Sequence, residues 1–309
     1  MDELLPLSWT RIDGLKPAYR DTRLQISGLR WITSAEIPFD YSFQIIHEDL
    51  AHTYPEGYVF RGCPPEMAAC FASLDCNVMR TGAEAVLEMD SEHFGKKSVR
   101  ASLARGKKQG YVEEFEMNDL NREHLEELQI QNTHAGKPEL KHLFRSAPSW
   151  RCRCFVFRSF AGKWLAAMTL SERGQNVVHT ELMLRHRNAP GDIMESLVAG
   201  IFETLRNEGV HEWSLGEVPF MMLTQSPENS LKPMEQLMVS LVSNCKHAYD
   251  FEGLYRFKNK FAPRWREVMI CATAQPTPVI LTELAFSMGF TDLLMHESFG
   301  YIRHLMIPS

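Results

Sequence analysis

A segment that reads as a strand running directly into a helix carries residues suited to binding an anion. Residues 177–184 are rich in β-branched and apolar side chains, which is typical of a strand, and residues 192–208 show the apolar spacing of a helix. Pro190 and Gly191 form the turn between them, and Arg185 adds a positive charge. Because a helix N-terminus has free N–H groups and a positive dipole end, the junction at Gly191 predicts a phosphate or pyrophosphate site. A solvated basic loop is the alternative.

A second basic feature lies upstream, where six basic residues fall between positions 96 and 108 without an acidic residue among them. On the helix predicted over residues 91–110, Lys96 and Arg100 lie one turn apart and Lys97 lies beside them. The formal net charge of the chain is −6, which argues against a general nucleic-acid binder. We therefore interpret Lys96, Lys97 and Arg100 as local contacts for phosphate groups, with a solvated helix face as the alternative.

Composition places the chain among ordinary globular proteins, with 309 residues, 44% hydrophobic and 23% charged. We expect no transmembrane helix, because no apolar run is long enough, and no signal peptide, because the N-terminus is acidic. The seven cysteines form no paired CxxC motif, so we expect free thiols and no metal site. Together these features predict a cytoplasmic protein.

The alternation of strands, helices and a hairpin predicts a mixed sheet of the α/β or α+β class. We expect strands at residues 23–32, 41–46, 58–61, 77–87 (two short strands), 111–117, 153–158, 164–171, 177–184, 211–215, 268–273 and 298–306. We expect the further helices at residues 64–74, 118–131, 234–243, 255–261 and 280–288.

Three blocks of sequence, in order, resemble one known family. The first block is Gly82-Ala83-Glu84-Ala85, followed by Phe94-Gly95-Lys96-Lys97 and Arg100. The second block consists of Glu181-Leu182-Met183, Ala189-Pro190-Gly191 and Ser214-Leu215-Gly216. The third block runs from Tyr249 to Trp265 and includes Gly253-Leu254, Lys258, Lys260, Phe261 and Pro263. Together they resemble the C-terminal catalytic domain of the phosphatidylglycerol lysyltransferases (aminoacyl-phosphatidylglycerol synthases), which belongs to the acetyltransferase-like superfamily.

This resemblance implies a fold of two tandem acetyltransferase-like (GNAT-like) halves, of which the first is abbreviated here. We accordingly expect an N-terminal half over residues 1–110 and a C-terminal half over residues 111–309, which would carry the active site.

The resemblance also implies an aminoacyltransferase. The amino acid would pass from aminoacyl-tRNA to a hydroxyl acceptor, a phospholipid headgroup such as phosphatidylglycerol. No cofactor is implied beyond the aminoacyl-tRNA donor. The expected partners are this tRNA and an anionic phospholipid or membrane surface, with the protein peripheral to the inner face of the membrane. Because the flippase half of many family members is absent, a separate membrane protein is a further expected partner.

Residue roles follow from the same resemblance. Glu181 stands at the family's Asp position and would hold the α-ammonium or basic side chain of the donor. Lys258 and Lys260 match two family lysines and would bind the tRNA end, the lipid phosphate or the developing negative charge. Ser214 and Gly216, which match the family's Ser/Asn-Leu-Gly, are expected to contact substrate.

One position departs from the family pattern. Leu184 stands where the family has Arg, and the neighbouring Arg185 would point to the opposite face of a strand. The amino-acid specificity of the family therefore does not carry over.

Two other function classes stay open. An acyl-CoA-dependent N-acyltransferase would use the same strand–helix junction, although the usual glycine-rich pyrophosphate loop is absent and Pro190 lacks an N–H group. A non-catalytic module that binds lipid headgroups or tRNA is the other. A hydrolase is disfavoured, because His179, His211 and His247 show no metal spacing and no Ser or Cys partner in the sequence.

Overall fold

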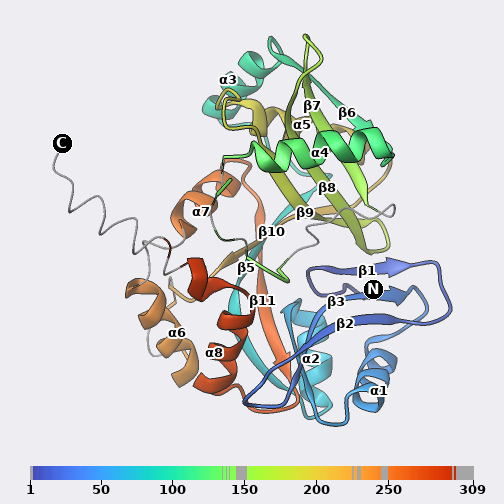
Figure 1. Cartoon of the computed structure of the whole chain (residues 1–309), viewed down its shortest axis with the longest axis vertical. Helices are drawn as coiled ribbons and strands as arrows, with labels where there is room; N and C mark the ends of the chain where they lie inside the picture. Colours follow the sequence, from blue (N-terminus) through green and yellow to red (C-terminus); the bar gives the residue numbers. More distant parts are fainter. Residues whose placement is uncertain are drawn as a thin grey trace.

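Eleven strands form one mixed sheet that runs the length of the molecule in the computed structural model (Figure 1). The structure describes residues 3–133, 135–136, 138, 140–143, 152–224, 226–227, 231–244, 250–293 and 296. Along the sheet the strands follow the order β1-β3-β4-β11-β5-β10-β9-β8-β7-β6, and β2 pairs with β3. The predicted mixed α/β class is confirmed.

The strands divide into two groups along this order. The first group is β1 (Trp9–Ile12), β2 (Ala18–Arg23), β3 (Arg30–Pro38), β4 (Tyr58–Cys63), β5 (Asn77–Glu88) and β11 (Arg264–Ala272). The second is β6 (Gly110–Phe115), β7 (Arg153–Ser159), β8 (Trp164–Gly174), β9 (Val177–Arg185) and β10 (Glu212–Pro219). Because β11 lies between β4 and β5 and is antiparallel to both, a late segment completes the first group. The division at residue 110 stays a prediction.

Helices cover both faces of the sheet. They are α1 (Phe43–Thr53), α2 (Pro65–Ser73), α3 (Lys97–Gly106), α4 (Asp119–Ile130), α5 (Ile193–Asn207), α6 (Pro233–Asn244), α7 (Phe251–Asn259) and α8 (Pro278–Ser287). None of the helices in the described ranges is long and apolar enough to cross a membrane.

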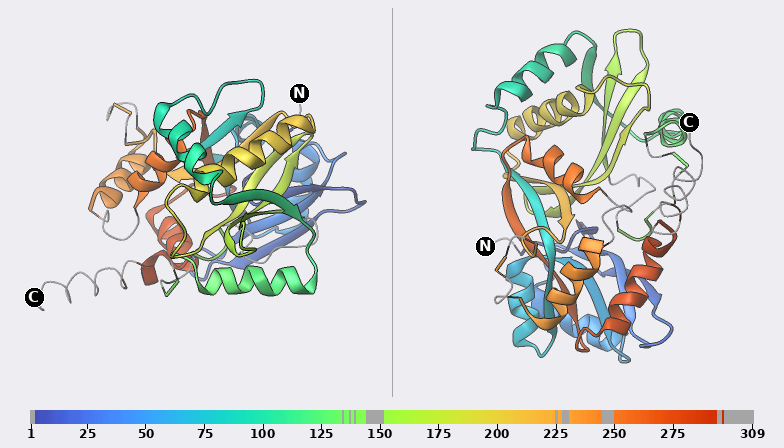
Figure 2. Two further views of the ribbon diagram at one scale, coloured as in Figure 1. Left: turned by 90° about the horizontal axis from the view of Figure 1, so that it is seen from above. Right: turned by 90° about the vertical axis from the view of Figure 1, so that its left-hand side faces the viewer.

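The second group of strands is packed between two helices, α5 on one face and α4 on the other (Figure 2, left). Helix α5 buries Ile193, Leu197, Ile201 and Leu205, the i+4 series expected from the sequence, against one face of β7 and β8. Helix α4 begins at the Asn118 cap, as predicted, and buries Leu125 and Leu128 on the other face. This sandwich fixes the strands that carry the site.

Several predicted elements are corrected by the structure. Residues 41–46 are not a strand: Ser42 caps α1, in which Phe43, Ile46 and Leu50 are buried at helical spacing. Residues 77–87 belong to one continuous strand, β5, rather than two. Lys96 is the N-cap of α3, so the basic helix begins six residues later than expected. Helix α7 begins at Phe251 instead of residue 255. The predicted strand at residues 298–306 lies outside the described residues.

Candidate active site

The candidate site lies where the parallel strands β9 and β10 part from each other. They are paired only over Val177–His179 and Glu212–Ser214. Beyond this point the register of β9 against β8 shifts at Glu181, and that of β10 against β5 shifts between Ser214 and Glu217. Such irregularities in a ladder redirect side chains and free backbone groups. The chain therefore places Glu181 and Gly216 in irregular backbone on the two separating strands.

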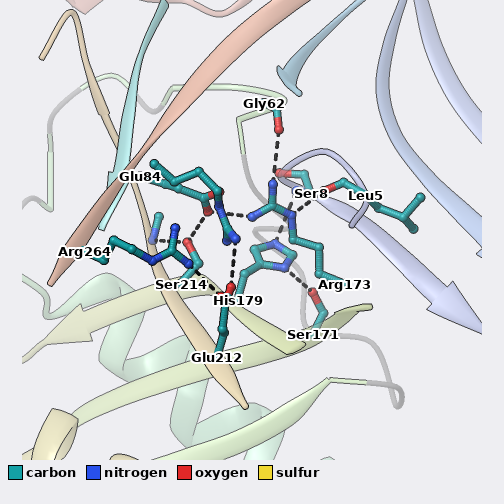
Figure 3. Close-up of polar contacts among 12 residues, drawn as sticks. Leu5, Ser8, Gly62, Glu84, Ser171, Arg173, His179, Glu212, Ser214 and Arg264 are labelled. Carbon is teal, nitrogen blue, oxygen red and sulfur yellow. Dashed lines mark hydrogen bonds and ion pairs between the residues drawn. The ribbon is translucent and has the colours of Figure 1, made fainter. Parts of the chain in front are cut away.

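A buried polar cluster of Ser171, His179 and Glu181 occupies this point on β8 and β9. All three residues are less than 5% exposed. The Ser171 hydroxyl donates to Glu181 Oε1 at 2.6 Å and lies 3.3 Å from His179 Nδ1, and His179 Nε2 lies 3.2 Å from the same carboxylate oxygen. The backbone N–H of Ser8 donates to His179 Nε2 at 3.2 Å (Figure 3). Glu181 is thus held rigidly inside the protein.

The prediction that His179 has no serine partner is wrong. Ser171 is paired with His179 in register on the adjacent strand. The Ser171 hydrogen points to Glu181, so the hydroxyl is not activated by the histidine as it would be in a hydrolase triad. The hydrolase class stays disfavoured, now on geometry.

A second buried carboxylate, Glu84 on β5, lies between two guanidinium groups. Arg173 Nη1 and Arg266 Nε lie 2.5 and 2.7 Å from its oxygens, and the Ser214 hydroxyl donates to it at 2.6 Å (Figure 3). Burial alone would raise the pKa of Glu84, but the two positive charges outweigh burial and hold it at about 2. Arg173 also donates to the backbone oxygens of Leu5 and Gly62. This cluster fastens β5, β8, β10 and β11 together behind the site.

Lys258 reaches the irregular part of β10 from α7. Its side chain is buried, and its Nζ donates to the backbone oxygen of Glu217 at 3.0 Å. Burial lowers the pKa of Lys258 to about 7, because the negative charges of Glu217 and Glu84 only partly offset the lost hydration.

Gly216 lies beside the amine of Lys258. Its φ of +88° favours glycine, and a Cβ atom there would lie 3.5 Å from Lys258 Nζ. The Gly216 N–H donates to Ser214 Oγ at 3.1 Å, and Ser214 is in register with His179. The structure therefore brings Ser214, Gly216 and Lys258 together at the irregular part of β10, with Glu181 on the neighbouring strand β9. The roles of these four residues stay predictions.

Lys260, by contrast, lies at the surface. It is 45% exposed and its Nζ pairs with Glu195 of α5 at 2.6 Å. Lys96 donates to the backbone oxygen of Asn259 beside it. Lys97 and Arg100 are exposed on α3, where Arg100 borders an open hollow of about 340 Å³ together with Phe94, Phe202 and Arg206. These four basic residues form a surface next to the site and do not enter the buried cluster.

The predicted anion seat at Gly191 lies beside acidic side chains. Asp192, the N-cap of α5, is bound by Arg105 at 2.6 and 2.8 Å, and Glu195 lies in the first turn. The hydrogen bonds from Arg105 hold the pKa of Asp192 at about 2. The seat at Gly191 stays a prediction, with two carboxylates reducing its positive field.

Arg185 lies on the face away from Glu181. It pairs with Ala166 of the core beneath α5, whereas Leu184 pairs with Ala167, on the same face of β8 as Ser171. Arg185 therefore does not replace the family's arginine at position 184, as the sequence predicted.

Sequence reasoning did not single out Ser171, Arg173 or Arg266. A signal existed for the partner of the two arginines, because Glu84 is a lone carboxylate in the apolar run of β5 and a buried charge requires a counterion. Among the residues that the structure describes, no three His, Cys, Asp or Glu side chains are grouped to hold a metal ion.

Comparison with known proteins agrees with this geometry. Residues 47–272 match the family model described as "Phosphatidylglycerol lysyltransferase, C-terminal". The chain is 24% identical over 235 residues to phosphatidylglycerol lysyltransferase of Bacillus subtilis strain 168; the match covers 72% of this chain and 27% of that protein, so the chain spans about a quarter of the length of this relative.

Two solved structures have the same fold. L-PGS from Bacillus licheniformis matches with a TM-score of 0.60 at 19% identity, covering 80% of this chain and 76% of the other. The C-terminal domain of a putative lysylphosphatidylglycerol synthetase from Agrobacterium fabrum matches with a TM-score of 0.60 at 20% identity, covering 80% and 75%. The family match extends over most of the chain and includes every strand that builds the site, from β4 to β11. The chain therefore belongs to the transferase family formed by the C-terminal domains of the phosphatidylglycerol lysyltransferases.

Proposed function

We propose that this protein transfers an aminoacyl group from aminoacyl-tRNA to a hydroxyl of the phosphatidylglycerol headgroup. The observation that carries the proposal is a buried amine, Lys258, at the irregular part of β10 where β9 and β10 separate, with the buried carboxyl group of Glu181 on β9, in a chain of this family. Such a site can hold a cationic donor and move one proton, which are the two tasks that this transfer requires.

The chemistry exchanges one ester for another. The acceptor hydroxyl oxygen attacks the carbonyl carbon of the aminoacyl ester, a new C–O bond forms, and the bond to the ribose oxygen of the tRNA breaks. The acceptor proton must leave and the ribose oxygen must gain a proton, so a group that accepts and returns one proton balances the reaction. Because the donor is already activated, alignment and proton transfer account for most of the catalysis.

Lys258 is the group we assign to the proton transfer. With a pKa of about 7, about half of the amines are uncharged at neutral pH and can accept the proton of the acceptor hydroxyl. The resulting ammonium ion then protonates the leaving ribose oxygen. The backbone carbonyl of Glu217 orients the amine at 3.0 Å throughout.

Glu181 is the group we assign to the donor's ammonium. Its carboxyl group is buried and held by Ser171 at 2.6 Å, so it is preorganised to bind a cation. Ser214 and Gly216 lie on the Lys258 side of the site and would contact the substrate. The exposed cations of α3, Lys97 and Arg100, would meet tRNA or lipid phosphates outside the buried cluster. The work would take place at the inner face of a membrane.

A transfer assay tests the proposal. The purified protein would be mixed with tRNA charged with labelled amino acids and with extracted phospholipids in detergent micelles. We expect label to move to the phosphatidylglycerol fraction, and its chromatographic identity to name the amino acid. Uncharged tRNA plus free labelled amino acid is the control for the activated ester. If label stayed on tRNA with every lipid fraction, the proposal would be refuted, and a transfer from acyl-CoA would be tested next.

A further inference from the structure

An exposed aromatic pair projects from one end of the molecule. Phe160, in the turn between β7 and β8, is 68% exposed, and Tyr111, at the start of β6, is 45% exposed. Their ring centroids lie 6.3 Å apart. The turn from β7 to β8 and the end of α3 lie together at this extremity in both the front and side views (Figures 1 and 2). Exposed aromatic rings of this size are costly to leave in water, so the pair indicates a contact surface.

The tip is built rigidly rather than left loose. The Phe160 N–H donates to the backbone oxygen of Gln109 at 3.2 Å, which joins the hairpin to the turn after α3. Gly162 closes the hairpin with φ of +85°, and its N–H donates to the Ser159 oxygen at 2.8 Å. The aromatic rings are thus presented on a fixed backbone.

Three lysines lie on the same two turns as the rings. Lys107 and Lys108 end the basic stretch of α3, and Lys163 follows Phe160 in the hairpin; all three are exposed. Within the described part of the chain, no carboxylate forms an ion pair with these lysines, and the nearby Glu113 is paired with Arg158 at 2.7 Å. We call these five residues, Lys107, Lys108, Tyr111, Phe160 and Lys163, the docking tip. It combines apolar rings with unpaired positive charge on a protein of net charge −6.

We propose that the docking tip binds the interface of an anionic phospholipid bilayer. Aromatic rings are favoured at the level of the headgroups, and lysines beside them reach the lipid phosphates through flexible stems. Each lysine near an anionic surface contributes about a fivefold gain in affinity. A projecting, convex tip suits a flat bilayer, whereas single-stranded nucleic acid is bound in a groove that follows its backbone. The inference rests on the proposed function only in that the acceptor is a membrane lipid.

Binding to vesicles tests the tip without any donor. We would measure cosedimentation of the purified full chain with vesicles of phosphatidylglycerol and phosphatidylcholine, and with vesicles of phosphatidylcholine alone. We expect binding only to the anionic vesicles, with affinity falling as salt is raised. Phe160→Ser should weaken it about tenfold, and Lys163→Glu at least as much, because it also reverses a charge.

Matched variants elsewhere on the surface serve as controls. Phe286 on α8 is 69% exposed, so Phe286→Ser removes an equally exposed ring at a distant place, and Lys16→Glu reverses an exposed charge in the loop between β1 and β2. Both controls should bind as the unmodified protein does. If the controls and the tip variants lost affinity equally, or if the unmodified protein did not bind anionic vesicles, the proposal would be overturned. If the tip residues were needed for binding charged tRNA but not for binding vesicles, the proposal would also be overturned.

The outcome is separable from the proposed function. Transfer to phosphatidylglycerol dissolved in detergent micelles does not require docking on a bilayer, so the Phe160→Ser variant should transfer normally there and poorly to vesicles. If the protein bound vesicles through the docking tip but transferred no amino acid, the docking tip would be supported and the aminoacyltransferase activity refuted. If it transferred an amino acid but bound vesicles equally well without the tip residues, the activity would be supported and the docking tip refuted.

Discussion

Two lysines of one motif, Lys258 and Lys260, stand two residues apart near the end of α7 and experience opposite environments. Lys258 is buried, donates to a backbone carbonyl and has its pKa lowered to about 7. Lys260 is 45% exposed and pairs with the carboxylate of Glu195 at 2.6 Å. At Lys258 the charges of Glu217 and Glu84 only partly offset the loss of hydration, whereas Lys260 keeps contact with water and has a carboxylate partner. This difference is the reason why we propose proton transfer for Lys258 and only a local ion pair for Lys260.

Replacing Lys258 should produce the largest effect. Lys258→Met keeps the length of the side chain but removes the proton acceptor, and we expect the rate of transfer to fall by about 10² to 10⁴. Lys258→Arg should be equally inactive, because a guanidinium does not lose its proton near neutral pH. Normal transfer by either variant would contradict the role of Lys258.

Folding stability separates this role from a structural one. The pKa of Lys258 is lower in the folded state than its ordinary value of 10.5. Burial of this lysine therefore lowers the free energy of unfolding of the protein increasingly as pH falls from about 10.5 to about 7, and by a constant amount below that. Lys258→Met should therefore raise the free energy of unfolding at neutral pH by on the order of 2–4 kcal/mol, measured by urea denaturation. A destabilised Met variant would indicate that the lysine is needed for folding.

The pH dependence of transfer is a second test of the difference between Lys258 and Lys260. If the uncharged amine of Lys258 accepts the proton, the rate should fall about tenfold for each unit of pH below about 7 and level off above it. The same fall in rate below about pH 7 should be seen in Lys260→Ala, because Lys260 is not the group that we assign to the proton transfer. A rate that did not change between about pH 5.5 and pH 7.5 would rule out a proton acceptor with this pKa.

Features that depend on neighbouring residues in the sequence could be predicted better than features that depend on contacts between distant segments. The periodicity of Ile193, Leu197 and Ile201 correctly predicted helix α5. The strand predicted at residues 41–46 was wrong because its β-prone side chains outweighed the helix cap at Ser42, which was not recognised.

Long-range pairing could not be read from the sequence. Arg173 and Arg266 lie 89 and 182 residues from Glu84, and an isolated arginine in a strand usually faces solvent. The insertion of β11 between β4 and β5 likewise depends on contacts between distant segments. The difference between Lys258 and Lys260 is of this kind, because burial by neighbouring elements, and not the motif, separates the two side chains.

Glu181→Gln tests the role proposed for Glu181, which is to bind the ammonium group of the aminoacyl donor. Glutamine keeps the volume and can still accept the hydrogen bond of Ser171, so stability should change by less than about 1 kcal/mol. Loss of the negative charge should raise the KM for the aminoacyl donor by about 10- to 100-fold, because a charge-assisted contact with its ammonium is removed. Ser171→Ala is the companion variant, expected to weaken transfer less. Parallel loss of stability and transfer in Glu181→Gln would favour a structural carboxylate.

Lys260→Ala should have the smallest effect. The ion pair is half-exposed on the lysine side, so solvent screens it, and its loss should cost about 0.2–1 kcal/mol of stability. Glu195 is nearly buried, and its Oε2 has no hydrogen-bond partner within the described residues, so part of the cost comes from leaving this carboxylate uncompensated. Glu195→Gln removes that charge, and the double variant should therefore recover stability relative to the sum of the two single changes. Transfer should fall less than about threefold in all three variants. If Lys260→Ala instead lost transfer about 100-fold with stability unchanged, Lys260 would belong to the catalytic machinery, as the family motif implies, and burial would not be what distinguishes the two lysines.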